Sequence, residues 1–212
     1  MTPPNNTRTP IHLTFDDGPD PVWTPRVLDA LHRTRVRATF FVIAPKARRC
    51  PALIRAMTQA GHGVEFHCVE HVRHTDSPRA KIEADLREGL ETLSTLGVHP
   101  RLWRPPWGVT ALWTAALAEQ FGLDLALWTA DTHDWRGDSA GKMFDNIEDR
   151  LAPGAVVLMH DGLGPGALRS GCEETVALIP PLANRIRTLG HETAPLSPRN
   201  LPPLEARWRT SA

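Results

Sequence analysis

The chain has 212 residues, of which 41% are hydrophobic and 23% are charged, values that are typical of a globular protein with one sizeable domain. Its 24 basic and 24 acidic residues give a formal net charge of zero, which argues against a nucleic-acid partner or an anionic membrane surface. The sequence contains no apolar run of the roughly 18 residues that a membrane span requires.

Two further features bear on the cellular location. The stretch from Met1 to Pro10 is polar and proline-rich and has no hydrophobic segment like that of a secretory signal, so we expect a cytoplasmic protein. The three cysteines, Cys50, Cys68 and Cys172, are odd in number and irregularly spaced, and we expect them to be reduced thiols. The sequence leaves the oligomeric state undefined.

Short apolar runs alternate with longer amphipathic stretches along the chain. This alternation predicts a parallel β-sheet covered by helices, either open or closed into a barrel. The continuous apolar character of the runs fits strands that are buried on both faces. The predicted strands, in chain order, are Ile11–Phe15, Ala38–Ile43, Gly63–His67, Leu102–Arg104, Leu125–Ala130, Ala155–His160 and His191–Ala194.

About six helices are expected between these strands, and five of them can be placed from their end signals. Thr24, followed by Pro25, is predicted to be the N-cap of the first helix, and Ser77 is predicted to cap another. Glycines mark the ends of the later ones. The first predicted helix begins at Thr24. The other four span Pro51–Ala60, Pro78–Leu96, Thr110–Phe121 and Glu174–Leu189.

Residues suited to catalysis or metal binding are concentrated at the carboxyl ends of the predicted strands. In barrels and open α/β sheets these ends meet at one edge, where active sites form. This clustering predicts an enzyme. The residues concerned are Asp16 and Asp17, His67, Arg104, Asp131 and Asp134, and His160.

Asp16 and Asp17 are adjacent carboxylates, and His67 and His71 stand four residues apart. The i, i+4 spacing puts two imidazoles on one side of a helical turn or tight loop. A first-row metal accepts imidazole together with carboxylate and leaves positions open for water and substrate. These four residues could supply three metal ligands and one base, with Arg104 as the counter-charge of the free carboxylate. Alternatively, the two acids only form a helix cap and turn.

The segment Arg104–Gly108 reads as a rigid turn after a strand. Its two prolines lack amide protons, so the first free backbone donor after Arg104 belongs to Trp107, which suits an oxyanion hole. His160 could act as a general acid if a buried carboxylate raises its pKa, and either Asp131 or Asp134 could serve that purpose.

The tryptophans near these segments divide into two expected groups. Core packing accounts for Trp103 and Trp128, whereas Trp107 and Trp135 are better placed as flat walls for a sugar ring. Two further histidines lie near the His67 segment and are expected to face solvent: His62 and His74.

In this order the segments resemble the motifs of the NodB-type polysaccharide deacetylases, the family 4 carbohydrate esterases that remove N-acetyl groups from amino sugars. The resemblance implies an α/β fold, a distorted (β/α)7 barrel, with one divalent metal, usually Zn2+, with Co2+, Ni2+, Fe2+ or Mn2+ as alternatives. It covers about residues 11–196, so we expect a single domain over residues 1–212 with short tails. The motifs are Thr14–Pro19, His67–His71, Arg104–Gly108, Asp131–Trp135 and Leu158–Asp161.

The resemblance also implies roles at the matching positions. Asp17, His67 and His71 would be the metal ligands. Asp16 would be the general base that takes a proton from a metal-activated water, and Arg104 would orient it.

The remaining implied roles concern the substrate. The Trp107 amide would bind the oxyanion, and His160, tuned by Asp134, would be the general acid that protonates the leaving amine. Leu158 would line the pocket for the acetyl methyl group, and Trp135 would form part of the groove wall.

The second motif departs from the family pattern at three positions. Phe66 stands where the family normally has Asn, Cys68 where it has Ser or Thr, and Val72 where it has Pro. Both histidines are retained, but the loop that carries them has lost polar anchors.

The leading hypothesis is hydrolysis of an N-acetyl group on an amino sugar, a chito-oligosaccharide or a related small N-acylated metabolite. A second hypothesis keeps the site and changes the substrate to a cyclic amide or imide, as in relatives with this fold. A third is a catalytically silent metal-dependent binding domain, against which the retained base, acid and Arg104 argue.

Overall fold

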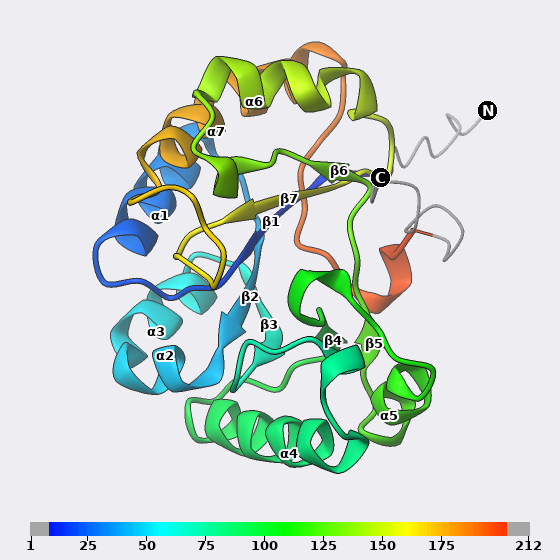
Figure 1. Cartoon of the computed structure of the whole chain (residues 1–212). Helices are drawn as coiled ribbons and strands as arrows, with labels where there is room; N and C mark the ends of the chain where they lie inside the picture. The colour runs from blue at the N-terminus through cyan, green and yellow to red at the C-terminus, as the bar shows by residue number, and fades with distance from the viewer. Residues whose placement is uncertain (1–8, 203–212) are drawn as a thin grey trace, which may run out of the picture.

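The computed structural model describes residues 9–202. Its centre is a parallel sheet of seven strands in the order β5-β4-β3-β2-β1-β7-β6, curled into a distorted barrel with helices on the outside (Figure 1). The predicted α/β class is therefore confirmed. The strands are β1 (His12–Asp16), β2 (Thr39–Ile43), β3 (Gly63–Cys68), β4 (Leu102–Trp103), β5 (Asp124–Leu125), β6 (Ala130–Asp131) and β7 (Val156–His160).

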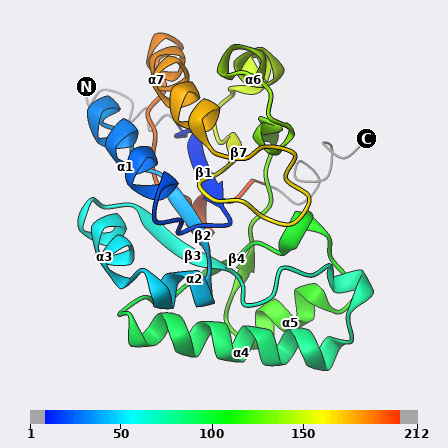
Figure 2. The ribbon, with the colours of Figure 1, turned by 60° about the vertical axis from the view of Figure 1, so that its left-hand side comes forward.

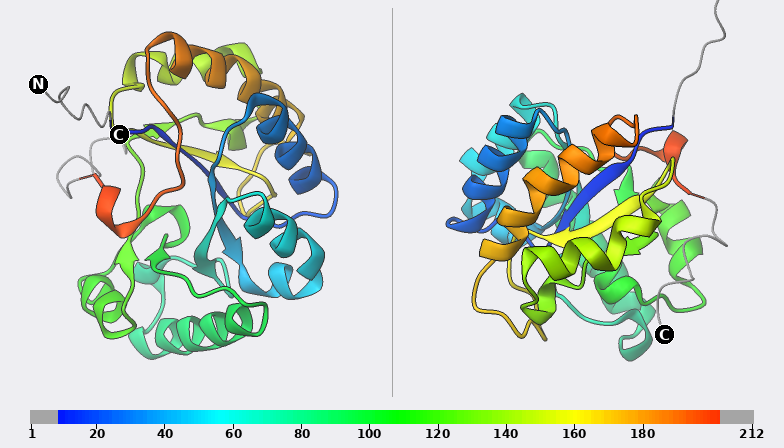
Figure 3. Two further views of the ribbon diagram at one scale, coloured as in Figure 1. Left: turned by 180° about the vertical axis from the view of Figure 1, so that it is seen from behind. Right: turned by 90° about the horizontal axis from the view of Figure 1, so that it is seen from above.

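Helices cover the outer surface of the sheet, and α1 and α7 lie side by side along one flank (Figures 2 and 3). Between residues 9 and 202, no helix has both the length and the apolar content needed to cross a bilayer. The α-helices are α1 (Trp23–Thr34), α2 (Ala44–Arg49), α3 (Pro51–Gln59), α4 (Arg79–Thr95), α5 (Thr114–Gln120), α6 (Ala140–Ile147) and α7 (Glu173–Thr188). Short 3-10 helices are η1 (His74–Asp76), η2 (Pro106–Gly108), η3 (Asp134–Arg136), η4 (Glu148–Arg150) and η5 (Pro198–Asn200).

Successive side chains of a strand point to opposite faces of the sheet, and here both faces are buried. On β2, Phe40 belongs to the large cluster that includes residues of the outer helices, whereas Phe41 belongs to a smaller, second cluster. The guanidinium of Arg104 lies 4.0 Å above the centre of the Phe41 ring. The second cluster therefore forms an apolar floor beneath the polar strand ends. It consists of Phe41, Leu102, Ala126, Val156 and Leu196.

The prediction of one strand over Leu125–Ala130 is wrong, because its two ends belong to opposite edges of the sheet. The amide of Ala126 donates to Trp103 O on the β4 side, and the amide of Thr129 donates to Val156 O on the β7 side, both at 2.9 Å. The segment between them crosses from one edge of the barrel to the other. An apolar run of this length does not reveal from sequence that its hydrogen-bonding partner changes halfway.

Other predicted elements also need correction. The segment His191–Ala194 forms a single bridge, between Thr193 and Ile11, and is not a strand. Thr24 lies inside α1, where its hydroxyl accepts from the Asp20 amide at 2.7 Å and donates to Asp161. Helix α4 begins after Pro78 with no side-chain cap, so Ser77 does not cap it. The short helices α2 and α6 are absent from the predicted set, and α2 follows β2 without a break.

The expectation that His62 and His74 face solvent is also wrong, because both are buried. His62 Nδ1 accepts a hydrogen bond from the Ala38 amide at 3.1 Å, and His74 Nδ1 lies 3.1 Å from the Thr114 hydroxyl. Burial lowers the pKa of each imidazole to about 4. Both are neutral structural residues near neutral pH.

Replacing Phe40 by Ala should lower the free energy of unfolding by about 3–5 kcal/mol, because it opens a cavity in the main cluster. Phe40 is fully buried and stacks on Phe15 with ring centres 5.2 Å apart. Urea denaturation measures the change, and the exposed Val22→Ala is the control, with an expected effect within about 0.5 kcal/mol. A loss below about 1 kcal/mol for Phe40→Ala would contradict this packing.

Candidate active site

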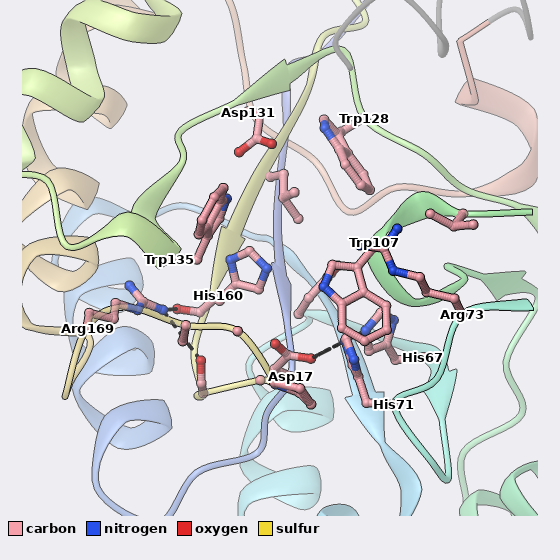
Figure 4. A pocket seen from close by; sticks show the side chains of 18 residues that line it. Asp17, His67, His71, Arg73, Trp107, Trp128, Asp131, Trp135, His160 and Arg169 are labelled. Atoms are coloured by element: carbon pink, nitrogen blue, oxygen red, sulfur yellow. Dashed lines mark hydrogen bonds and ion pairs between the residues drawn. The ribbon is translucent and has the colours of Figure 1, made fainter. Parts of the chain in front are cut away.

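Most of the predicted site residues line one pocket of about 480 Å³ at the carboxyl ends of the strands (Figure 4), and Arg104 and Asp134 lie behind it. Side chains from β1, β3, β6 and β7 meet there with loops that follow β4 and β7. The predicted residues that line the pocket are Asp16, Asp17, His67, His71, Trp107, Asp131, Trp135, Leu158 and His160.

The two adjacent carboxylates separate at the end of β1. Strand pairing places Asp16 opposite His160, the last residue of β7. Asp17 then adopts a left-handed backbone conformation with φ 71°, which is uncommon for a residue with a side chain. The turn directs the Asp17 carboxylate toward His67 and His71, whereas Asp16 interacts with Arg104.

Asp17, His67 and His71 form a compact group of potential metal ligands. One ligand atom from each lies within 4.8 Å of the other two, and Asp17 Oδ1 is 3.4 Å from His67 Nε2 and 3.3 Å from His71 Nε2. Asp17 Oδ1 is buried and has no hydrogen-bond donor among the described residues. Burial opposes ionisation of Asp17, but the two imidazoles outweigh it and hold its pKa well below the usual range. One carboxylate and two imidazoles suit a divalent metal with open positions.

The two imidazoles are held in different ways. His67 Nδ1 donates to the carbonyl of Arg104 at 2.6 Å, which leaves Nε2 free to bind a metal. His71 Nδ1 is buried and has no partner among residues 9–202. Its ring instead lies edge-on against Trp107, with ring centres 4.2 Å apart.

Arg104 and Asp16 form a buried ion pair. Arg104 is fully buried, and its Nη1 donates to Asp16 Oδ1 at 2.7 Å and to the Thr14 hydroxyl at 2.8 Å. Its Nε donates to the carbonyl of Ala126 at 2.9 Å, on the segment that crosses the barrel. These contacts fix the Asp16 carboxylate and supply the counter-charge that the sequence predicts.

The carboxylate partner of His160 is Asp134. His160 Nδ1 lies 2.7 Å from Asp134 Oδ1, and the His160 amide donates to Asp134 Oδ2 at 2.9 Å. Burial opposes a positive charge on His160, but the Asp134 carboxylate outweighs it and raises the pKa of His160 to about 9. Asp131 instead accepts from the His133 amide at 2.8 Å. Sequence reasoning allowed either Asp131 or Asp134 as the carboxylate partner of His160, and in the structure the partner is Asp134.

Arg169 is a site residue that sequence reasoning missed. Its Nη1 donates to Asp134 Oδ2 at 3.0 Å and its Nη2 to His160 O at 3.1 Å, so it holds both members of the pair. Thr175 adds a further bond to Asp134 Oδ2 at 2.8 Å. An arginine in a glycine-rich loop gives no sequence signal of such a role, because the Asp134 that it contacts lies 35 residues earlier in the chain.

The loop that carries Arg169 also packs closely against Asp17. A Cβ on Gly164 would lie 2.1 Å from Asp17 Oδ2, and one on Gly162 would lie 2.7 Å from Asp17 O. Only glycine permits this approach, so the glycine-rich run after Asp161 was an available sequence signal. Lys46 of α2 joins the two segments, donating to Asp17 O at 2.8 Å and to Leu163 O at 3.2 Å.

Trp107 lies in the turn after β4 with φ 54° and is 39% exposed. The following amides, of Gly108 and Val109, donate to Pro105 O and Pro106 O. For the Trp107 amide, the described part of the chain offers no backbone acceptor, which leaves this donor free.

The aromatic walls differ in one respect from expectation. Trp103 is buried, as predicted, and its indole donates to His67 O at 3.0 Å. Trp128 packs against the apolar floor but also lines the pocket, so core packing alone does not account for it. Figure 4 shows Trp107, Trp128 and Trp135 around the opening above Asp17 and His160.

Two of the unusual residues of the second motif, Phe66 and Cys68, are buried and lie outside the group of potential metal ligands. Phe66 is fully buried and packs near Trp103 with ring centres 6.4 Å apart. Cys68 is buried, and burial, aided by the nearby carboxylates, raises the pKa of its thiol well above the usual value. Cys68 is not part of the ligand group, and a thiol that stays protonated is a poor metal ligand.

Comparisons with known proteins identify the family of this chain. A family model described as polysaccharide deacetylase matches residues 4–126. A peptidoglycan-N-acetylglucosamine deacetylase of Bacillus cereus is 32% identical over 196 residues, which are 92% of this chain and 89% of that protein. A chitooligosaccharide deacetylase of Bradyrhizobium sp. is 33% identical over 193 residues, 88% of each chain.

Among solved structures, a family 4 carbohydrate esterase from Streptomyces lividans in complex with acetate is 30% identical, with a TM-score of 0.81. The match covers 90% of this chain and 94% of that one, which confirms the predicted distorted (β/α)7 barrel. The chain belongs to the polysaccharide deacetylase family, whose named relatives are deacetylases that hydrolyse amide bonds.

Proposed function

We propose that this protein is a metal-dependent deacetylase that removes an N-acetyl group from an amino sugar carried by an oligosaccharide. One observation carries the proposal: a group of three metal ligands, a base held by Arg104 and an acid held by Asp134 face the same pocket. The named activities of the relatives, on peptidoglycan and chito-oligosaccharides, support this substrate class. Cytoplasmic location stays a prediction.

Asp17, His67 and His71 would hold the metal, and zinc is the proposed ion because one carboxylate and two imidazoles suit it. When bound there, such an ion supplies Lewis acidity and lowers the pKa of a water molecule. The orphaned Asp17 Oδ1, which faces both Nε2 atoms, is the structural reason for this assignment.

Asp16 acts as the general base in this proposal. Its ion pair with Arg104 occupies Oδ1 at 2.7 Å and orients the carboxylate. The other oxygen is then available to take a proton from the attacking water. Because the pair is buried, this carboxylate has little freedom to rotate away from the reacting atoms.

Trp107 and His160 act on the amide itself. The free Trp107 amide can donate to the oxygen that gains negative charge when water attacks the carbonyl. His160, charged up to about pH 9 through Asp134, can then give its Nε2 proton to the departing amine. Leu158 offers an apolar surface for the acetyl methyl group, and Trp107 and Trp135 offer flat surfaces for sugar rings.

Acetate release from N-acetylated chito-oligosaccharides and from peptidoglycan tests this function directly. Ring opening of cyclic amides and imides tests the second hypothesis, in which the same base and acid act on a different substrate. Tight sugar binding without release of acetate from either glycan, and without ring opening, would favour the silent binding domain.

Replacing Asp16 by Asn should lower kcat by about 100- to 10,000-fold, the usual contribution of a general base, while the protein still binds one equivalent of metal. His67→Ala should lose both activity and metal. Acetate assays and metal analysis of the purified variants check this, with the exposed Asp149→Asn as control. Near-native turnover by Asp16→Asn would exclude Asp16 as the base.

The pH profile should depend on Asp134. Because the pKa of His160 is raised to about 9, the acid is present below that pH and is lost as pH rises through it. The profile of kcat/KM should therefore fall near pH 9. Asp134→Asn removes the carboxylate charge and should move this fall to lower pH.

Asp131→Asn is the matched control for this measurement, because Asp131 lines the pocket but bonds to His133. Its alkaline limb should stay within a few tenths of a pH unit of that of the unmodified protein. If the alkaline fall of kcat/KM in Asp134→Asn stays at the pH of the unmodified protein, His160 is not the group that titrates.

A further inference from the structure

The loop that carries His71 lacks the side-chain anchors typical of its family, yet it must hold an imidazole in place. Val69 and Val72 pack against the main apolar cluster. These contacts hold one side of the loop against the core, but they do not fix the orientation of its backbone. His71 Nδ1 has no hydrogen bond among the described residues. The position of this ring therefore depends on its own backbone and on contacts with Trp107, His67 and the Asp17 carboxylate, none of which is a hydrogen bond to Nδ1.

That backbone is held by Asp85, which projects from α4. The amide of Val69 lies 3.0 Å from Asp85 Oδ1 and 3.1 Å from Asp85 Oδ2, and the amide of Glu70 donates to Oδ2 at 2.6 Å. One carboxylate thus satisfies two successive amides immediately before His71. Hydrogen bonds from amides to a charged oxygen are stronger than those to a neutral one.

Helix α4 is positioned for this contact by Phe66, one of the residues that depart from the family pattern. A Cβ on Gly89 would lie only 2.1 Å from Cε2 of Phe66, so the ring fits against α4 because residue 89 is glycine. Asp85 is four residues before Gly89 and lies on the same helical face. In Figure 2, α4 lies below β3.

We infer that Asp85 is the positioning residue of the metal centre: it fixes the backbone ahead of His71 and replaces the polar anchors lost from the second motif. The contact between Phe66 and Gly89 sets the distance between β3 and α4, and therefore the reach of Asp85 to the loop. The inference rests on the proposed metal site. Asp85 touches neither metal nor substrate and acts only through His71.

An exposed ion pair on the same loop provides a matched control. Lys81 Nζ lies 2.8 Å from Glu70 Oε2, and the two side chains are 48% and 60% exposed. Such pairs contribute little. Lys81 is on α4, one turn before Asp85, so Lys81→Ala changes the same helix and loop without removing an amide acceptor.

The test is the affinity of the purified apoprotein for Zn2+ and Co2+, measured by competition with a chelator. Asp85→Ala should bind both ions about 10- to 100-fold more weakly, the usual effect of losing an outer partner of a ligand. Lys81→Ala should stay within about twofold. Asp85→Asn keeps one acceptor oxygen for the amides, so its affinity should lie between those of the unmodified protein and Asp85→Ala.

Thermal unfolding of the apoproteins separates positioning from general stability. If Asp85→Ala lowers the apo Tm but binds metal as tightly as the unmodified protein, Asp85 is merely structural and the inference is wrong. If Asp85→Ala does not fold, Asp85→Asn decides by the same criterion, and unchanged affinity in that variant overturns the inference.

Activity is a separate readout. Excess metal should restore most of the kcat of Asp85→Ala, because its base and acid are intact, and no restoration would contradict action through His71 alone. If the unmodified protein binds metal but releases no acetate, the proposed function fails while the affinity test of Asp85 still stands. If the unmodified protein binds neither ion, both fail.

Discussion

The buried ion pair between Arg104 and Asp16 is the contact on which the rest of the site depends. Through its side chain, Arg104 holds Asp16 and Thr14 of β1 and the crossing segment at Ala126. Through its carbonyl, it holds His67 of β3. A single residue directly after β4 therefore sets the relative positions of the proposed base, one proposed metal ligand and the barrel interior.

Such a pair is costly to bury, and its surroundings explain how it is tolerated. The guanidinium lies over Phe41 and near Trp128. Three acceptors pair with its Nε and Nη1, whereas Nη2 is buried without a hydrogen-bond partner among the described residues. Removing one partner of a buried pair leaves an uncompensated charge, at a cost of about 3–5 kcal/mol. The pair fixes the position of the Asp16 carboxylate. It also keeps this group apart from the carboxylate of Asp17, which points toward His67 and His71.

Much of the site could be predicted because it lies at the ends of strands with simple patterns. The runs that form β1, β2 and β7 are short and rich in apolar residues, so the positions of Asp16 and His160 followed from sequence. The pairing of β1 with β7 then brings these two residues opposite each other. The family motifs added the separate roles of Asp16 and Asp17, which spacing alone left open.

The parts that escaped prediction depend on contacts between distant segments. Asp85 lies in mid-helix, and Arg169 lies in a loop, so neither position has a local pattern that marks it. His62 was expected to face solvent, but the Ala38 amide and a packed interior hold it. The strand expected over Leu125–Ala130 divides because each half finds a different partner.

The two adjacent acids have separate proposed tasks: Asp17 binds the metal, and Asp16 remains paired with Arg104. A crystal structure of the zinc-loaded protein, with the ion located by anomalous scattering, tests this assignment most directly. We predict one ion at about 2.0–2.2 Å from Asp17, His67 and His71, with the Asp16–Arg104 pair intact. An ion bound by Asp16, or an ion placed away from the two histidines, would contradict the account.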